Sequence, residues 1–588
     1  MKRRFRVLAV ALLGLVGCMQ PQQARLQSEE DLERDKETAV QVIGDVTAVA
    51  NAGPTNLSGV GLVTGLAGTG GSPPPGSDFR RMLENDLQKR GVEGINEILA
   101  SPNNAVVLVS ARLPAGAQHN DPIDVEITLP PQSRVTSLRG GVLLECHLFN
   151  YSSTQQLTPG TGGPNRALLG HPLAKAQGTL LVGFGDGDES AQVRQARIWG
   201  GGRAQVERPL MLSLNANQQF ARISMRVAER INETMQGPYH GPSSTLAEAK
   251  TKEVVNLRVP AQYRHNLARY LRVVRFIPLQ EAPPPNSPYR RKLEEDLLDP
   301  ARTVTAALRL EALGSETQPV FRKGLKSPHA LVRFACAEAL AYLGSPSCGE
   351  ELGKLAAEEP MLRAYCLTAL ASLKDEAICD IQLRELMNSN SPETRYGAFR
   401  ALRAMDERAS GVDGQHLNQS FWLHRVAQGS APLVHISTSQ RAEIVLFGDD
   451  PCLEAPFSFL AGPEFTVTAT EGDEQVTVSR FSKTQGTKRK QCSMKVADVL
   501  RAVGELGGTY PDAVELVRQA EKNKCLSCPV AADALPEAPS VQMLARDGLG
   551  EASKTTDPDI LNARSEFGVT PTLFQAGPPK KPARPAAE

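Results

Sequence analysis

Alternating hydrophobic and polar residues dominate the first half of the chain. AVVLVSARLP (105–114) and PIDVEITLP (122–130) have the two-residue period of β-strands, and proline and glycine clusters separate such runs. A helical period interrupts them twice, at residues 78–90 and 220–235. Strands with only a few helices predict an α+β region between residues 42 and 282.

A different pattern follows the proline-rich linker EAPPPNSP (281–288). Amphipathic helical segments repeat at 332–344, 362–374 and 394–406, with a weaker helix between copies and an arginine near each start (Arg333, Arg363, Arg395). Helix pairs at so short a period are typical of an α-solenoid. The segments resemble short HEAT-like repeats, and we expect such a solenoid over residues 285–408. A protein-binding scaffold and a rigid spacer are both consistent with it.

Strand-like alternation returns after the repeats, in runs such as RAEIVLFGDD (441–450) and EQVTVSRF (474–481). Helical segments follow at 496–507 and 511–523, so we expect a second α+β region over residues 428–535. The basic run GTKRKQ (486–491) is interpreted as a hairpin tip. The final segment, residues 545–588, is rich in proline, alanine and lysine and is predicted to be disordered.

The first residues, MKRRFRVLAVALLGLVGC, combine a basic start with an apolar segment too short to span a membrane. Residues 15–18 (LVGC) resemble the bacterial lipobox. This resemblance implies a signal peptide over residues 1–17, lipidation of Cys18, and a tether over residues 18–41. An ordinary signal peptide that happens to contain a cysteine is the alternative. By the same resemblance, Met19 after the cysteine favours the outer membrane.

Export would place the cysteines in an oxidising compartment, where disulfides persist. We regard four cysteines of the C-terminal region as possible disulfide partners without assigning the pairs: Cys452, Cys492, Cys525 and Cys528. The C-x-x-C of the last two has no second pair at zinc-finger spacing, which argues against a structural zinc site.

Charge and motif searches indicate no catalytic, cofactor or metal site. Lys+Arg and Asp+Glu both number 65 and aromatic residues make up 5 %, so nothing points to nucleic acid. The histidines are scattered, and Asp186 and Asp188 lack the spacing of a calcium loop. We therefore expect a protein that is not an enzyme.

The glycine-rich stretch NLSGVGLVTGLAGTGGS (56–72) resembles a phosphate-binding loop at first sight. However, Gly71 occupies the position where a P-loop needs lysine, and Gly65 comes one residue too late for the dinucleotide fingerprint. The stretch is better interpreted as a strand, residues 60–66, entering a turn that needs positive φ.

The same glycine stretch opens a longer series of similarities, in order along the chain, to the flagellar P-ring protein family. The segments that resemble characteristic strings of that family are VIGDVTAV…NLSGVGLVTGLAGTGG (42–71), NNAVVLVSARLP (103–114), SLRGGVLL (137–144), GGRAQVER (201–208), SQRAEIVLFGDD (439–450) and KVADVLRAVGELGGTYPDAVELVRQAEKNKCL (495–526). The repeats have no counterpart in the family, and a lipobox is unusual there. The expected fold is therefore α+β, with strand-rich P-ring-like domains interrupted by an α-solenoid.

The resemblance implies a structural subunit of a multimeric collar around the flagellar rod, in the periplasm at the peptidoglycan layer. Its implied partners are further copies in a homo-oligomeric ring, the rod and outer-membrane ring proteins, peptidoglycan, and the outer membrane through a lipid on Cys18. Nucleic acid is not among them. The alternative is a non-flagellar envelope lipoprotein that binds a protein partner through its HEAT-like repeats.

Overall fold

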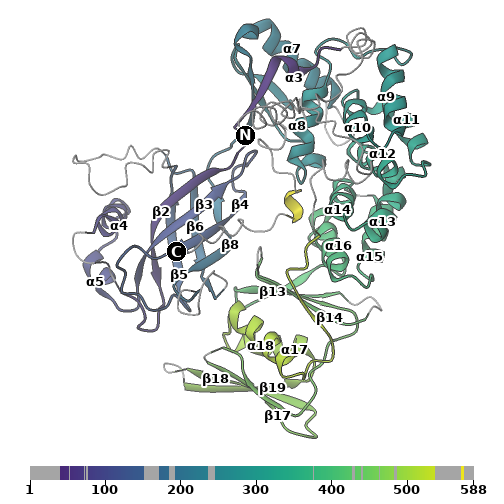
Figure 1. The fold of residues 1–588 in the computed structure, drawn as a ribbon. Coiled ribbons are helices and arrows are strands. Elements are labelled where there is room, and N and C mark those ends of the chain that lie inside the picture. Colours follow the sequence, from purple (N-terminus) through teal and green to yellow (C-terminus); the bar gives the residue numbers. More distant parts are fainter. Residues whose placement is uncertain are drawn as a thin grey trace, which may run out of the picture.

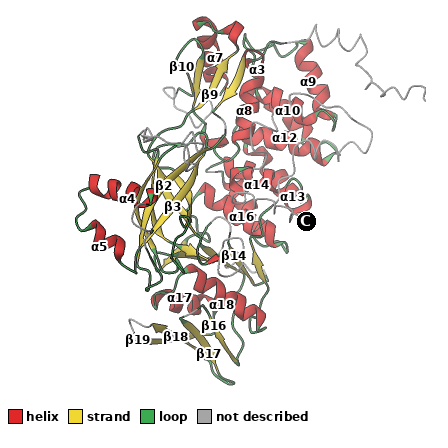
Figure 2. Cartoon of the chain, turned by 60° about the vertical axis from the view of Figure 1, so that its left-hand side comes forward, coloured by secondary structure: helices red, strands yellow, loops and turns green. Residues whose placement is uncertain are grey.

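The computed structural model describes residues 40–574, except for 52, 72, 74–76, 151–170, 184–191, 236–244, 375, 427–430, 439–440, 463, 483–485 and 537–570. Helices and strands both contribute extensively, which confirms the predicted α+β class. Two strand-rich parts of the N-terminal region, a helical region and a C-terminal region are visible as separate lobes (Figures 1 and 2).

The largest sheet has seven strands in the order β4-β3-β2-β5-β6-β8-β7. Its strands are β2 (Thr55–Thr64), β3 (Ala105–Leu113), β4 (Pro122–Thr128), β5 (Val142–Leu148), β6 (Ala174–Thr179), β7 (Leu181–Val182) and β8 (Ala196–Ala204). Because β4 also pairs with β8, the sheet closes on itself. Alternation along β4 buries Ile123, Val125 and Ile127 inside it. Helices α4 (Asp78–Lys89) and α5 (Ile95–Ala100) cover a small outer cluster around Leu62 and Val106.

A second, four-stranded sheet of the N-terminal region has the order β1-β9-β11-β10. Its strands are β1 (Thr47–Ala50), β9 (Leu210–Leu214), β10 (Ala247–Ala249) and β11 (Val254–Leu257). Its helices are α3 (Ile43–Val46), α7 (Ala221–Thr234) and α8 (Leu267–Phe276), and the short 3-10 helix η3 (Ala261–Tyr263) precedes α8. The core of this lobe is continuous with that of the helical region.

The helical region, residues 288–405, contains α9 (Pro288–Leu298), α10 (Thr303–Glu311), α11 (Gln318–Gly324), α12 (Ala330–Tyr342), α13 (Gly349–Glu358), α14 (Arg363–Ser372), α15 (Ala377–Leu386) and α16 (Pro392–Met405). The three segments singled out as repeats form α12, α14 and α16. Helix α12 contacts α10 and α14, and α14 contacts α16, so these helices form one row; α13 and α15 pack beside it. The side chains of Ser287 and Ser391 cap α9 and α16 by accepting backbone N–H bonds.

The C-terminal region has two sheets with helices α17 (Val496–Glu505) and α18 (Tyr510–Lys522) between them (Figure 1). One sheet has the order β12-β13-β15-β14-β20, and the other the order β16-β17-β18-β19. The strands are β12 (Gly414–Leu417), β13 (Phe421–Val426), β14 (Leu433–Ser437), β15 (Glu443–Phe447), β16 (Phe457–Leu460), β17 (Phe465–Ala469), β18 (Gln475–Ser482), β19 (Gly486–Ser493) and β20 (Val530–Ala532). Leu181 of the N-terminal sheet is buried in the core of this region, and Trp199 packs against it, so the two regions touch directly.

At this end of the chain, one sequence prediction is wrong and a second fails at four residues. The basic run 486–491 lies within edge strand β19 rather than at a hairpin tip, because it pairs residue by residue with β18. Within the segment expected to be disordered, residues 571–574 include a 3-10 turn, η7 (Thr572–Phe574), in which Leu573 and Phe574 are buried.

Candidate functional site

Several backbone amides of the glycine-rich turn are used for hydrogen bonds within the fold. The N–H groups of Leu66, Gly70 and Gly71 donate to the carbonyls of Asn103, Pro102 and Asn104, at 2.8–2.9 Å. A P-loop needs such amides to point at the ligand, so the geometry agrees with a structural turn.

Close packing explains two glycines of strand β2 without any ligand. A Cβ at Gly59 would lie 2.4 Å from the carbonyl oxygen of His147, and one at Gly61 would lie 2.7 Å from Leu143 Cδ1. Neighbouring strand β5 therefore approaches β2 too closely for any side chain at these positions.

The N-terminal region is joined to the helical region by a buried charge network, which we call the first junction: Tyr263, Asn266, Arg269, Glu311, Glu338 and Tyr342. Arg269 on α8 donates from Nε to Glu311 Oε2 at 3.1 Å, and from Nη1 to Glu338 Oε2 at 2.5 Å. Tyr263 donates its hydroxyl to Glu311 at 2.6 Å. One arginine of the N-terminal region thus binds helices α10 and α12 of the helical region.

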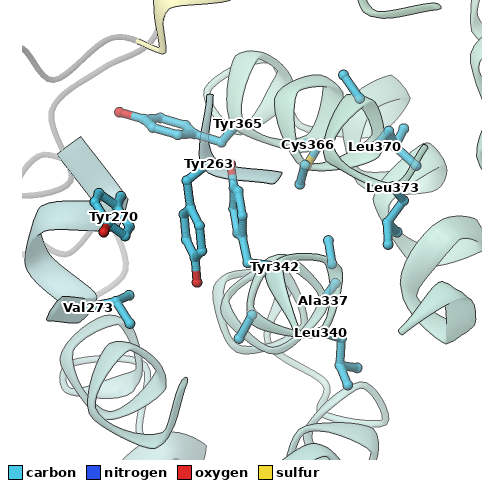
Figure 3. Close-up of a cluster of buried hydrophobic side chains, with 14 of the residues drawn as sticks. Tyr263, Tyr270, Val273, Ala337, Leu340, Tyr342, Tyr365, Cys366, Leu370 and Leu373 are labelled. Carbon is cyan, nitrogen blue, oxygen red and sulfur yellow. The ribbon is translucent and has the colours of Figure 1, made fainter. Parts of the chain in front are cut away.

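Aromatic packing encloses the first junction. Tyr263 stacks on Tyr342 with ring centroids 4.8 Å apart, and the guanidinium of Arg269 lies 4.9 Å from the centroid of the Tyr342 ring. Asn266 donates to the Tyr342 hydroxyl at 3.0 Å. Figure 3 shows these tyrosines among the apolar side chains of α12 and α14, which exclude water from the charges.

Electrostatics set the protonation of the first junction. Burial raises the pKa of Glu338 to about 7, and the attraction of Arg269 only partly offsets this, while the neighbouring charge of Glu311 adds to it. Arg269 bonds both carboxylates, and Arg272 also lowers the pKa of Glu338, but together they do not outweigh the effect of burial.

A matching network, the second junction, joins the last helix of the helical region to the C-terminal region: Tyr396, Arg403, His424, Glu443 and Tyr510. Arg403 Nη1 on α16 donates to Glu443 Oε2 on β15 at 2.6 Å, and the Tyr396 hydroxyl donates to Glu443 Oε1 at 2.7 Å. The Tyr510 hydroxyl donates to the backbone oxygen of Glu443 at 2.9 Å. Tyr396 and Glu443 are each only 1 % exposed to solvent.

The charges of the second junction are balanced. Burial opposes ionisation of Glu443, but Arg403 and Arg441 outweigh it and lower the pKa of this carboxyl to about 2. Burial lowers the pKa of His424 to about 4, so this ring is neutral at neutral pH. A single ion pair therefore remains in the interface.

The repeated arginines tie successive units of the helical region together. Arg333 donates to the carbonyl of Pro328 at 3.0 Å and to Glu351 at 2.6 Å. Arg363 donates to the carbonyl of Ala356 at 3.0 Å. Further donations run from Arg363 to Glu393 at 3.2 Å and from Arg395 to the carbonyl of Ala431 at 2.7 Å. Each arginine thus satisfies a carbonyl outside its own helix.

The sequence reading did not predict either junction. The sequence did contain a signal for the two junctions, because Arg269, Glu338 and Arg403 each interrupt an otherwise apolar helical face. A charged residue at such a position is rarely buried without a partner. The partners lie 40–69 residues away along the chain, which local periodicity does not reveal.

The four candidate disulfide cysteines all lie in the C-terminal region, and each is a free thiol in the structure. Cys525 and Cys492 point their Sγ atoms at the carbonyls of Ala520 and Val476. Cys452 lies beside Ser527, whose N–H donates to the Cys452 carbonyl at 3.0 Å, and thus next to Cys528. The pairing stays a prediction. The lipidation candidate, Cys18, lies outside the described residues.

The described part of the chain holds neither a cluster of metal-ligating side chains nor a helix able to span a membrane. No group of three or more His, Cys, Asp or Glu side chains there could hold a metal ion. No helix there is long and apolar enough to cross a membrane. Asp186 and Asp188, considered for a calcium loop, lie outside this part.

Comparison with known proteins gives one consistent family. The sequence pattern of the family "Flagellar P-ring protein" matches residues 42–286. A protein of that name from Oleidesulfovibrio alaskensis is 30 % identical over 265 residues, which cover 43 % of this chain and 63 % of the relative. One from Escherichia coli O6:H1 is 32 % identical over 241 residues, covering 38 % of this chain and 58 % of the relative.

The matched region has clear limits. The chain spans less than two thirds of the length of these relatives, and the family match ends at residue 286, just before helix α9. The similarity expected for residues 439–526 lies beyond it and stays a prediction. Within these limits the resemblance read from the sequence is confirmed: residues 42–286 match the flagellar P-ring protein family.

Proposed function

We propose that this chain is a structural subunit of the flagellar basal-body P-ring. In this proposal many copies form a collar around the rod in the periplasm, at the peptidoglycan layer, and the chain has no enzymatic activity. The observation that carries the proposal is the family match over residues 42–286, which spans both sheets of the N-terminal region. The relatives are named flagellar P-ring proteins.

A collar of this kind needs stiff subunits, because a rotating rod loads them sideways. The two junctions support this role, since each places a hydrogen-bonded arginine–glutamate pair in a water-excluded interface between regions. Such networks specify one arrangement of the parts they connect. The ring itself would close through head-to-tail contacts, each using two different surfaces of the subunit.

The proposed setting follows from the N-terminal sequence. A lipid on Cys18 would anchor each subunit to the outer membrane, and residues 18–41 would provide the tether. The rod, the outer-membrane ring proteins and peptidoglycan are the proposed neighbours. Substituting Cys18 by alanine tests the anchor, because loss of the lipid should release the protein from the membrane fraction and lower its mass.

One observation favours a second candidate, an envelope scaffold that binds a protein partner without any flagellum. The helical region, residues 288–405, begins where the family match ends, and interlocking helix pairs of this kind provide extended binding surfaces. In this alternative the region is an α-solenoid that serves as the binding surface.

Deleting the gene in the host and restoring it on a plasmid separates the two candidates. The P-ring proposal predicts loss of swimming, basal bodies that lack the collar at the peptidoglycan layer, and recovery of both on complementation. Normal swimming with an intact collar in the deletion strain would contradict the proposal and favour the scaffold.

A further inference from the structure

The last described residues of the chain are part of the body of the protein. Residues 571–574 (Pro-Thr-Leu-Phe), which we call the tail motif, lie against helix α16. Leu573 is 7 % and Phe574 2 % exposed, and both belong to the core shared by the N-terminal and helical regions. In Figure 1 the motif is the yellow turn beside α14 and α16. The tail motif is therefore a buried part of the fold.

The seat of the tail motif draws on two regions of the chain. The N–H of Thr572 donates to the carbonyl of His265 at 3.0 Å, and His265 lies between η3 and α8 of the N-terminal region. Helix α16 belongs to the helical region. We call His265 together with α16 the tail seat. Because its two sides come from different regions, an occupant of the seat holds them together.

The chain before the motif is attached to the same helix. Pro536 is buried against α16, and its Cγ lies 2.8 Å from the position that a Cβ at Gly397 would take. Just upstream, strand β20 pairs in parallel with β14 of the C-terminal region. Pro536 and the tail motif, the described residues on either side of 537–570, therefore both lie at α16. Such a tether raises the effective concentration of the motif at its seat.

The seat is suited to an uncharged occupant. Burial, with nearby Arg264, Lys374 and Arg400, lowers the pKa of His265 to about 4, so that its ring is neutral at neutral pH. The motif carries no charged side chain and provides a leucine and a phenylalanine, whose burial excludes water.

We propose that residues 571–574 are a docking motif that fastens the N-terminal region to the helical region of the same chain, in a seat that also accepts the motif as a separate peptide. This role goes beyond the proposed ring function, and it holds for either candidate function.

Cutting the tether of the folded, full-length protein tests the proposal directly. A protease site inserted within residues 537–570 allows the tail to be cleaved after folding. The released fragment should stay with the body on gel filtration. With Phe574→Asp it should dissociate, whereas with the matched control Phe567→Asp, the other phenylalanine of the tail, it should remain.

A labelled peptide of residues 568–577 provides the second measurement. It should bind the full-length Phe574→Asp variant, whose seat is empty, and should bind wild type roughly a hundredfold more weakly, because the tethered motif competes. Leu573→Ala provides a milder variant if Phe574→Asp does not fold. Hydrogen exchange of residues 261–266 should rise in Phe574→Asp and fall again when the peptide is added.

Several outcomes would overturn the proposal. These are dissociation of the wild-type fragment after cleavage, equal behaviour of Phe574→Asp and Phe567→Asp, and no binding of the peptide to an emptied seat. Co-purification of a differently tagged second copy that depends on Phe574 would place the motif in a neighbouring chain and overturn the assignment within one chain.

Discussion

At the residue scale, the protein concentrates its buried charge at the two junctions. Arg269 and Arg403 are each at least nine-tenths buried and each bonds a buried glutamate from another region. Removing one member of such a pair leaves the other charge without compensation in an apolar surrounding, which costs far more than breaking a surface pair. Substitutions at the junction residues should therefore reduce the stability of the protein much more than substitutions in surface ion pairs.

Replacing Arg403 by methionine should destabilise the protein by about 3–5 kcal/mol, because Glu443 then stays buried without its partner. The matched control is Arg425→Met, which removes an arginine that pairs with Asp450 at the surface and should cost about 1 kcal/mol or less. Urea unfolding followed by circular dichroism measures both. Equal effects of the two substitutions would contradict the energetic role of the second junction.

The pH dependence of stability should depend on Glu338. Its pKa is raised to about 7 in the folded protein, above the ordinary value of 4.5, so the folded state holds this proton more tightly than the unfolded chain. Glu338 therefore stabilises the protein at low pH, and this contribution is lost as pH rises through about 7.

Glu338→Gln keeps the shape of the side chain without the titration. Between pH 5 and 8 its free energy of unfolding should fall less steeply than that of wild type. Parallel pH profiles for the two proteins would show that Glu338 titrates at its ordinary value.

Among the candidate cysteines, we predict a bond between Cys452 and Cys528. The bridge between Leu453 and Leu526 runs antiparallel and sets Cys452 opposite Ser527, one residue from Cys528. After export, peptide mapping without reduction should find these two linked and Cys492 free. A link from Cys492, or four free thiols in the exported protein, would contradict this pairing.

At the element scale, the helical region is held together by contacts between consecutive helices and also between helices two apart in the chain. Gly349 and Gly353 let α13 approach α15 so closely that a Cβ at Gly349 would lie 3.0 Å from Ile378 Cγ2. The arginines at the starts of α12, α14 and α16 add polar links across the turns. Periodicity along the sequence located these helices and their arginines, because both are local signals.

Arg363→Ala should cost about 2–4 kcal/mol, because it removes the donor that satisfies the Ala356 carbonyl and the pair with Glu393. Arg322→Ala is the matched control on α11, where the exposed arginine bonds Gln318 within its own helix. Its expected effect is below about 0.5 kcal/mol. Thermal unfolding of both variants gives the comparison. An Arg363→Ala variant as stable as wild type would contradict the proposal that Arg363 links neighbouring helices.

At the scale of the whole molecule, the N-terminal, helical and C-terminal regions all contact one another. The helical region runs along one side from the N-terminal to the C-terminal lobe, while Leu181 and Trp199 bring the closed N-terminal sheet against the C-terminal core (Figure 1). Sequence patterns predicted the α+β class, and the resemblance predicted the family match over residues 42–286. They could not predict the junctions or the seat of Phe574, because those contacts join residues far apart in the chain.

Electron microscopy of basal bodies from the host tests whether this chain builds the P-ring collar, as we propose. Averaged images of wild type should be compared with those of a strain whose chain carries a fused marker domain at its C-terminus. We expect a collar at the peptidoglycan layer with extra density repeated around it in the marked strain. A collar identical in the two strains, with the marker protein elsewhere in the envelope, would contradict the proposed P-ring role.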